Sequence, residues 1–279
     1  MTLSPKHRES IGRIGTQDDA DIDLAVAALA IAAASRPGVS KEPYQRHLAK
    51  LTEDVSVFAG SSRQHLYIDD CIDAMTQVIC RRNGYGCDPE TYDEIDAANL
   101  MHVIDNRRGL PVVLGIIFIH VARNLGWQMD GVDFPSRFLV RFDHGGERRI
   151  LDPSEGLVSL DPAALRALLK SVAGNEAELT PGACEPMSNR SILSRMQNNI
   201  KVRHLRAHRM EEALEVIETM ALIAPEEPAL WREAGIINAK LDNLKAAVAA
   251  LEEYLRRDGM SEQGAEARDL LRQLRSRLN

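Results

Sequence analysis

The sequence predicts an α+β protein with a helical N-terminal part, a small antiparallel sheet and a C-terminal tail of helical repeats. Hydrophobic residues make up 44% of the 279 residues, but aromatic residues make up only 4%, so the core must be aliphatic, which favours helices. Short apolar segments bounded by turn residues between residues 128 and 151 are typical of strands. Small and apolar residues in the tail recur with a 34-residue period, which indicates stacked helix pairs.

The N-terminal part reads as helices after a polar leader. Residues 1–18 are charged and lack hydrophobic periodicity, so we expect them to be disordered. Residues 19–35 and 42–58 are each expected to form a helix, and the first ends before the turn Arg36-Pro37-Gly38. A third helix is expected to end at Gly84.

The middle of the chain combines one apolar helix with three strands. Pro111 opens the helix, which runs to Gly126, because a first helical position needs no backbone N–H. Strands are expected near residues 128–134, 137–142 and 148–151, with a hairpin turn between the last two. Residues 174–187 contain glycine, proline and acidic residues and are expected to be a linker.

The tail, residues 188–279, is expected to be helical throughout. Trp231, Gly235 and Ala247 follow the spacing of a tetratricopeptide repeat that opens at Pro228. An earlier repeat has Ala213 at the matching small position but lacks the tryptophan and the glycine. Because each helix pair has an apolar face that only the next pair can cover, such repeats stack, and they commonly bind peptides.

Composition and motifs argue against several function classes. The formal net charge of −7 disfavours a nucleic-acid binder, although a basic stretch runs from Lys201 to Arg209. The four cysteines form no CxxC pair and have no zinc-like spacing, so we expect no metal and no cofactor. The chain shows neither a secretory h-region nor a membrane-spanning stretch, which predicts a cytoplasmic protein.

Several motifs together resemble one family. The chain has Arg108-Gly109-x-Pro111 before the apolar helix, Gly131-Val132-x-Phe134-Pro135 and Phe138–Arg141 in the strands, and Asp152-Pro153 after them. From about Leu66 to Leu168 it resembles the SirB family of bacterial transglutaminase-like proteins, which pair such a core with tetratricopeptide-type helices. The resemblance implies a transglutaminase-like (papain-like) domain over residues 19–173.

The resemblance also implies that the catalytic triad has been lost. In active transglutaminases a cysteine opens the helix, a histidine lies on the next strand, and an aspartate or asparagine follows on a third. The matching positions here hold Pro111, Ser136-Arg137 and Asp152. Proline offers no nucleophile, and an arginine stays protonated and cannot act as a base. We therefore expect no catalytic residue and, most simply, no enzyme.

Other roles for these residues stay open. Arg137 could pair with Asp152 across the old site or bind an anion, and Arg108 could pair with Asp105 or Asp152, so Arg108, Arg137 and Asp152 are the candidate binding residues. Equally, Asp152 could only cap a turn and Arg137 could be a solvated strand residue. His120, within the apolar helix, is expected to be a core histidine.

Two functions remain in competition. The first is a non-catalytic scaffold or regulator that binds a protein or peptide through its repeats. The alternative is a hydrolase or transferase of the cysteine-protease and transglutaminase superfamily with a rebuilt site, using Asp152 with an arginine or a relocated cysteine. Cys87, in a glycine-flanked loop, is the only cysteine whose setting suggests exposure, but the sequence assigns it no base.

Overall fold

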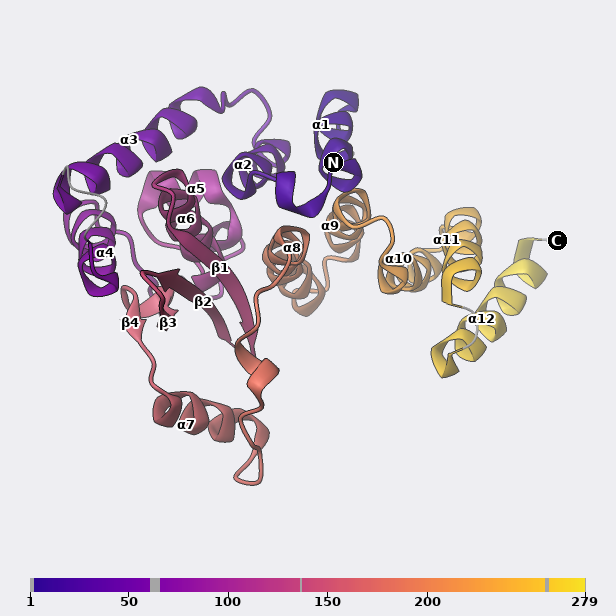
Figure 1. Cartoon of the computed structure of the whole chain (residues 1–279). Helices are drawn as coiled ribbons and strands as arrows, with labels where there is room; N and C mark the ends of the chain where they lie inside the picture. The colour runs from indigo at the N-terminus through magenta and orange to yellow at the C-terminus, as the bar shows by residue number, and fades with distance from the viewer. Residues whose placement is uncertain (1–2, 61–65, 136, 259–260, 279) are drawn as a thin grey trace. The chain divides into compact units, whose positions relative to one another are not determined.

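The computed structural model describes residues 3–60, 66–135, 137–258 and 261–278 (Figure 1). The chain divides into two compact units: the sheet unit, residues 18–196, and the repeat unit, residues 1–17 together with 197–279. Helices dominate both units and one small antiparallel sheet lies in the first, so the predicted α+β class is confirmed.

The sheet unit begins with helices. They are α2 (Leu24–Ala34), α3 (Glu42–Ala59), α4 (Ile68–Met75), its π-helical continuation η3 (Thr76–Arg82), and α5 (Leu100–Asn106). The Asp23 carboxylate caps α2 by accepting hydrogen bonds from the backbone N–H groups of Ala25 and Val26, at 3.1 and 3.0 Å. Nine of the eleven residues of α2 are buried, which is why its sequence is almost wholly alanine and other aliphatic residues.

Helix α6 (Pro111–Asn124) is the centre of this unit. Ten of its fourteen residues are buried, as expected of a helix that is apolar on every side. Helices α2 and α3 and strands β1 and β2 pack against it. Pro111 occupies its first turn, in agreement with the prediction.

The sheet has four antiparallel strands in the order β1-β2-β3-β4. They are β1 (Gln128–Phe134), β2 (Arg137–His144), β3 (Glu147–Asp152) and the two-residue β4 (Val158–Ser159), which was not predicted. One face packs on α6, where Gly115 leaves room for the ring of Phe138; a Cβ there would lie 2.3 Å from the ring. The other face is covered by Leu165 and Leu169 of α7 (Pro162–Ala173).

Residues 174–187, expected to be a linker, instead belong to the fold of the sheet unit. They contain a 3-10 turn, η6 (Pro181–Cys184), and the backbone N–H of Met187 donates to the Gly131 carbonyl of β1 at 2.8 Å. Leu179, Ala183 and Cys184 pack against the apolar face of the sheet. These few apolar residues outweigh the turn-like composition, because the sheet face would otherwise lie in water.

The expected disorder of residues 1–18 is also corrected. Helix α1 (Pro5–Thr16) is capped by Ser4 and buries Ile11 and Ile14. It packs against α9 of the repeat unit, with Gly15 lying close to the Leu222 carbonyl. The surface that buries this helix lies some 200 residues away in the sequence, so local composition does not reveal it.

The tail consists of five helices: α8 (Asn189–Arg206), α9 (Met210–Ile223), α10 (Pro228–Lys240), α11 (Leu244–Asp258) and α12 (Glu262–Leu278). Gly235 lets α10 approach α11 closely; a Cβ there would lie 2.6 Å from Leu251 Cγ. Ala247 is fully buried, and Trp231 Nε1 donates to the Pro225 carbonyl at 3.3 Å. These contacts explain why the repeat pattern needs small residues at two of the three positions.

The border between the two units differs from the expected one at residue 188. Asp19 caps the start of α8 by accepting hydrogen bonds from the backbone N–H groups of Asn189 and Arg190, at 2.8 and 2.9 Å. The first turns of α8 thus belong to the sheet unit, and the division falls after Met196. Within the described ranges, no helix combines the length and the apolar character needed to cross a membrane.

Candidate functional site

The carboxylate of Asp152 lies at the centre of the site that the sequence predicts. It is 1% exposed and accepts hydrogen bonds from Arg137 Nη1 at 2.6 Å, Ser154 N at 2.9 Å and Ser154 Oγ at 2.5 Å. The Ser154 contacts form the Asx turn that starts the 3-10 turn η5 (Pro153–Glu155). Asp152 therefore both caps a turn and pairs with Arg137, which the sequence had left as alternatives.

Arg137 covers this buried carboxylate from the solvent side. Its side chain is 40% exposed, so it is neither fully solvated nor part of the core. Because the guanidinium already binds Asp152, binding of a ligand anion there would have to compete with a buried carboxylate. Ser136, the other residue at the position expected for histidine, lies outside the described residues.

Pro111 begins α6, and η5 packs against this helix, so the three triad-like positions belong to adjoining elements. The N-terminus of α6 can favour a thiolate electrostatically, but the residue that opens the helix has no thiol. Of the residues described at these positions, Pro111 has no nucleophilic side chain, and the guanidinium of Arg137 is bound to Asp152 and cannot act as a neutral base. What the described residues form here is a charge pair between Arg137 and Asp152.

Arg108 binds the backbone of a neighbouring loop. Its guanidinium donates to the carbonyl oxygen of Gly84, and residues 86 and 108 form an isolated parallel bridge. Asp105, its proposed partner, instead binds Arg36, and the carboxylate of Asp152 binds Arg137. Arg108 therefore fixes the loop that carries Cys87.

The cysteines are poorly suited to nucleophilic chemistry. Burial raises the pKa of the Cys87 thiol, and the negative charges of Asp152, Glu155 and Asp88 raise it further, against the opposing effect of Arg137. Burial also raises the pKa of Cys184 above its usual value and that of Cys71 and Cys80 to about 11. A thiol that stays protonated at neutral pH is a weak nucleophile.

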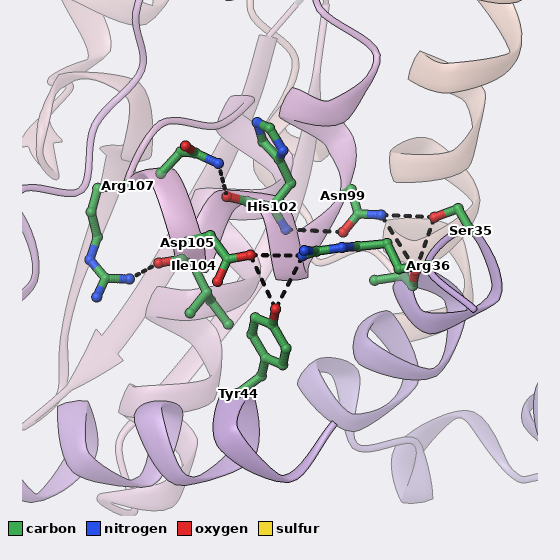
Figure 2. A network of polar contacts seen from close by, with 10 residues as sticks. Ser35, Arg36, Tyr44, Asn99, His102, Ile104, Asp105 and Arg107 are labelled. Atoms are coloured by element: carbon green, nitrogen blue, oxygen red, sulfur yellow. Dashed lines mark hydrogen bonds and ion pairs between the residues drawn. The ribbon is translucent and has the colours of Figure 1, made fainter. Parts of the chain in front are cut away.

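Figure 2 shows a polar network that joins α2, α3 and α5. Arg36 Nη1 donates to Asp105 Oδ2 at 2.8 Å and to the Tyr44 hydroxyl at 3.1 Å, and that hydroxyl donates to Asp105 at 3.1 Å. Beside it, Asn99 caps α5 by accepting from His102 N and donates to Ser35 Oγ at 2.9 Å. Each polar group has a partner within the protein, so we assign this network to the stability of the fold.

A second cluster surrounds the Tyr85 hydroxyl. Arg107 Nη1 and His47 Nε2 each lie 2.8 Å from this oxygen, and the Arg107 guanidinium stacks 4.8 Å from the ring centroid. Burial raises the pKa of Tyr85 to about 12, while burial followed by the charge of Arg107 lowers the pKa of His47. The phenol is therefore a poor acid, and the cluster mainly joins α3 to the end of α5.

Sequence reasoning did not find these two networks. The contacts of Asp105 with Arg36 and Tyr44, and those of Tyr85 with His47 and Arg107, join residues 22 to 69 positions apart, and no local pattern links side chains over such distances. Over the described parts of the chain, no group of three or more His, Cys, Asp or Glu side chains is arranged to hold a metal ion.

Comparison with known proteins places both halves of the chain. A family model described as the transglutaminase-like superfamily matches residues 42–198, and one described as the tetratricopeptide repeat matches residues 200–279. A "UPF0162 protein" of Xylella fastidiosa (strain Temecula1) is 26% identical over 252 residues, covering 87% of this chain and 86% of that protein. A "UPF0162 protein" of Vibrio cholerae is 26% identical over 235 residues, covering 84% and 86%. "Protein SirB1" of Salmonella typhimurium is 26% identical over 214 residues, covering 76% and 79%. No solved structure matches the chain.

Proposed function

The chain belongs to the transglutaminase-like superfamily, and from that premise we propose that it is a non-catalytic member that binds another protein or peptide through its repeat unit. One observation carries the proposal: the guanidinium of Arg137 binds the buried carboxylate of Asp152 at 2.6 Å, at the position where an active relative needs a base. With Pro111 in place of the nucleophile, two of the three chemical roles have no side chain to perform them.

The repeat unit supports the binding half of the proposal. Tetratricopeptide repeats generally mediate protein–protein interaction, and stacked helix pairs present an extended surface for peptides. The relatives are bacterial proteins, and we propose a cytoplasmic location for this chain as well.

The alternative, an amide hydrolase or transferase with a rebuilt site, would require an activated thiol. The charges of Asp152 and Arg137 act on the thiol of Cys87, so this is the cysteine to test first. The raised pKa of this thiol counts against the alternative, because activation of a nucleophilic cysteine lowers the pKa.

The test is affinity capture from a lysate of the source cells, with the full chain as bait. Deleting the tail would be a poor control, because α1 packs on α9 and would lose the helix that buries Ile11 and Ile14. Two point variants are better matched. Gly235→Leu loosens the packing of α10 on α11, and Asp152→Asn changes the carboxylate that pairs with Arg137 at the triad-like positions.

The proposal predicts partners that are captured by the wild type and by Asp152→Asn but lost with Gly235→Leu. Circular dichroism and the fluorescence of Trp127 check that the sheet unit of each bait remains folded. If capture depends on Asp152 and is unaffected by Gly235→Leu, binding does not run through the repeats and the proposal fails.

A further inference from the structure

A cavity of about 300 Å³ lies between α2, α3 and α6 in the sheet unit. The space between the helices stays open because some of the side chains that line it are small. Ala25 on α2 and Ala49 on α3 are two of them. Its volume is at the lower end of the range of small-molecule sites, and is about twice the roughly 150 Å³ that accommodates benzene.

The walls of the cavity are mainly apolar. Leu29 and Leu48 are 0% and 2% exposed and form deep parts of the lining, while Val26 at the rim is 44% exposed. An apolar body placed there would remove the exposed surface of Val26 from water, which is favourable by about 25 cal/mol per Å² of apolar surface.

His120 is one of four polar residues in the lining, with Gln45, Thr52 and Asn124. Asn124 Nδ2 lies 2.8 Å from the His120 carbonyl oxygen and 3.3 Å from its Nδ1. Because the atom facing a carbonyl oxygen must be the amide nitrogen and not the amide oxygen, Asn124 donates and Nδ1 accepts. In a neutral imidazole the proton then sits on Nε2, and none of the described residues takes a hydrogen bond from it.

The protonation state of His120 agrees with this tautomer. Burial lowers the pKa of His120 below its ordinary value, and the charge of Asp23 opposes this only in part. At neutral pH the ring is therefore an uncharged donor, as in binding sites where a few polar groups orient a mainly apolar ligand.

Charge further restricts the ligand. No lysine or arginine is among the residues that line the cavity, and the electrostatic influence of Asp23 on His120 is that of a nearby negative charge. An anionic ligand would lose hydration without gaining a cation.

We propose that this cavity binds a small, uncharged and largely apolar molecule, with an oxygen acceptor that takes a hydrogen bond from His120 Nε2. The site lies wholly in the sheet unit and is independent of the proposed repeat-mediated binding and of the Arg137–Asp152 pair. It also gives His120, expected from the sequence to be a core histidine, a place at the edge of the core.

The experiment is a titration of the purified full-length chain, followed in methyl NMR spectra by the signals of Leu29 and Leu48. The probes are acetophenone, which has one carbonyl acceptor; isopropylbenzene, of similar shape but without the acceptor; and benzoate, which is anionic. The variants are His120→Phe, which removes the donor, and Ala49→Phe, which fills the cavity from its rim. His102→Phe, at a partly exposed histidine of α5, is the matched control.

We expect saturable shifts of both leucines with acetophenone, and weaker binding of isopropylbenzene and benzoate. His120→Phe should weaken acetophenone binding by about two- to tenfold, which is the worth of one hydrogen bond, and leave isopropylbenzene binding unchanged. Ala49→Phe should abolish both, and His102→Phe should change neither.

Three outcomes would overturn the proposal. They are no leucine shift with acetophenone up to its solubility, equal affinity for acetophenone and isopropylbenzene with no effect of His120→Phe, or tighter binding of benzoate than of acetophenone. Thermal unfolding of each variant identifies any that fails to fold; should Ala49→Phe do so, the comparison of the two neutral probes on His120→Phe decides.

Discussion

Replacing Arg137 with glutamine should destabilise the sheet unit, because it removes the guanidinium that pairs with the buried carboxylate of Asp152. Asp152 is 1% exposed, and two donors from Ser154 would remain on Oδ1. A hydrogen bond to a charged group contributes about 1.5–3 kcal/mol to stability. Because the Arg137 side chain is 40% exposed, solvent screening reduces its share, and we expect a loss of about 1–2 kcal/mol in the free energy of unfolding.

The assay is urea unfolding followed by tryptophan fluorescence. Trp127 lies in the sheet unit and Trp231 in the repeat unit, so a Trp231→Phe background reports the sheet unit alone and avoids treating two units as one transition. The control is Lys50→Gln on α3, where the lysine side chain is 60% exposed and the ion pairs are on the surface. Its effect on the free energy of unfolding should be much smaller, because exposed ion pairs contribute little to stability.

If Arg137→Gln cost no more than Lys50→Gln, the pair would be a surface contact. Arg137 would then not be a structural partner of Asp152.

Three further predictions follow from single residues. Gly235→Ala places a Cβ 2.6 Å from Leu251 Cγ and should destabilise the repeat unit by about 1–3 kcal/mol in thermal unfolding. Gly12 is a helical glycine with open space around it, so Gly12→Ala should stabilise the same unit by about 0.5–1 kcal/mol. Burial raises the pKa of Asp143, but hydrogen bonds from two arginines outweigh it and hold the pKa below its usual value. The stability that this carboxylate contributes is therefore present above about pH 4 and lost as the pH falls through its folded pKa; Asp143→Asn should flatten that part of the stability–pH curve measured in urea. Pro111→Cys alone should create no amidase or amine-transfer activity, because Arg137 supplies no base, and detectable turnover by this variant would show that another group does.

The elements with strong local patterns were predictable. Helix α6 was located by Pro111 and its apolar run, the β2–β3 hairpin by its glycine-containing turn, and the repeats by Trp231 and Gly235. The family resemblance rested on motifs in these segments, and the comparisons confirm it.

What the sequence could not supply depends on distant contacts. Helix α1 packs on a surface made by α9, and Leu179 packs on a sheet face whose residues lie some 40 positions earlier in the sequence. The pairing of Arg36 with Asp105 likewise joins residues 69 positions apart, which no periodicity records. At the triad-like positions the residue types could be read from the sequence. Only the structure shows that Asp152 both caps the turn at Ser154 and binds Arg137.

The most direct test of the central claim is turnover by the purified full chain. Ammonia release and amine incorporation would be measured on a panel of glutamine-containing and other amide peptides, with Asp152→Asn and Cys87→Ser in parallel. We expect no turnover above that of a buffer control for any of the three proteins. Turnover by the wild type that disappears in either variant would mean that the site has been rebuilt for catalysis, and would contradict the claim that this transglutaminase-like domain is non-catalytic.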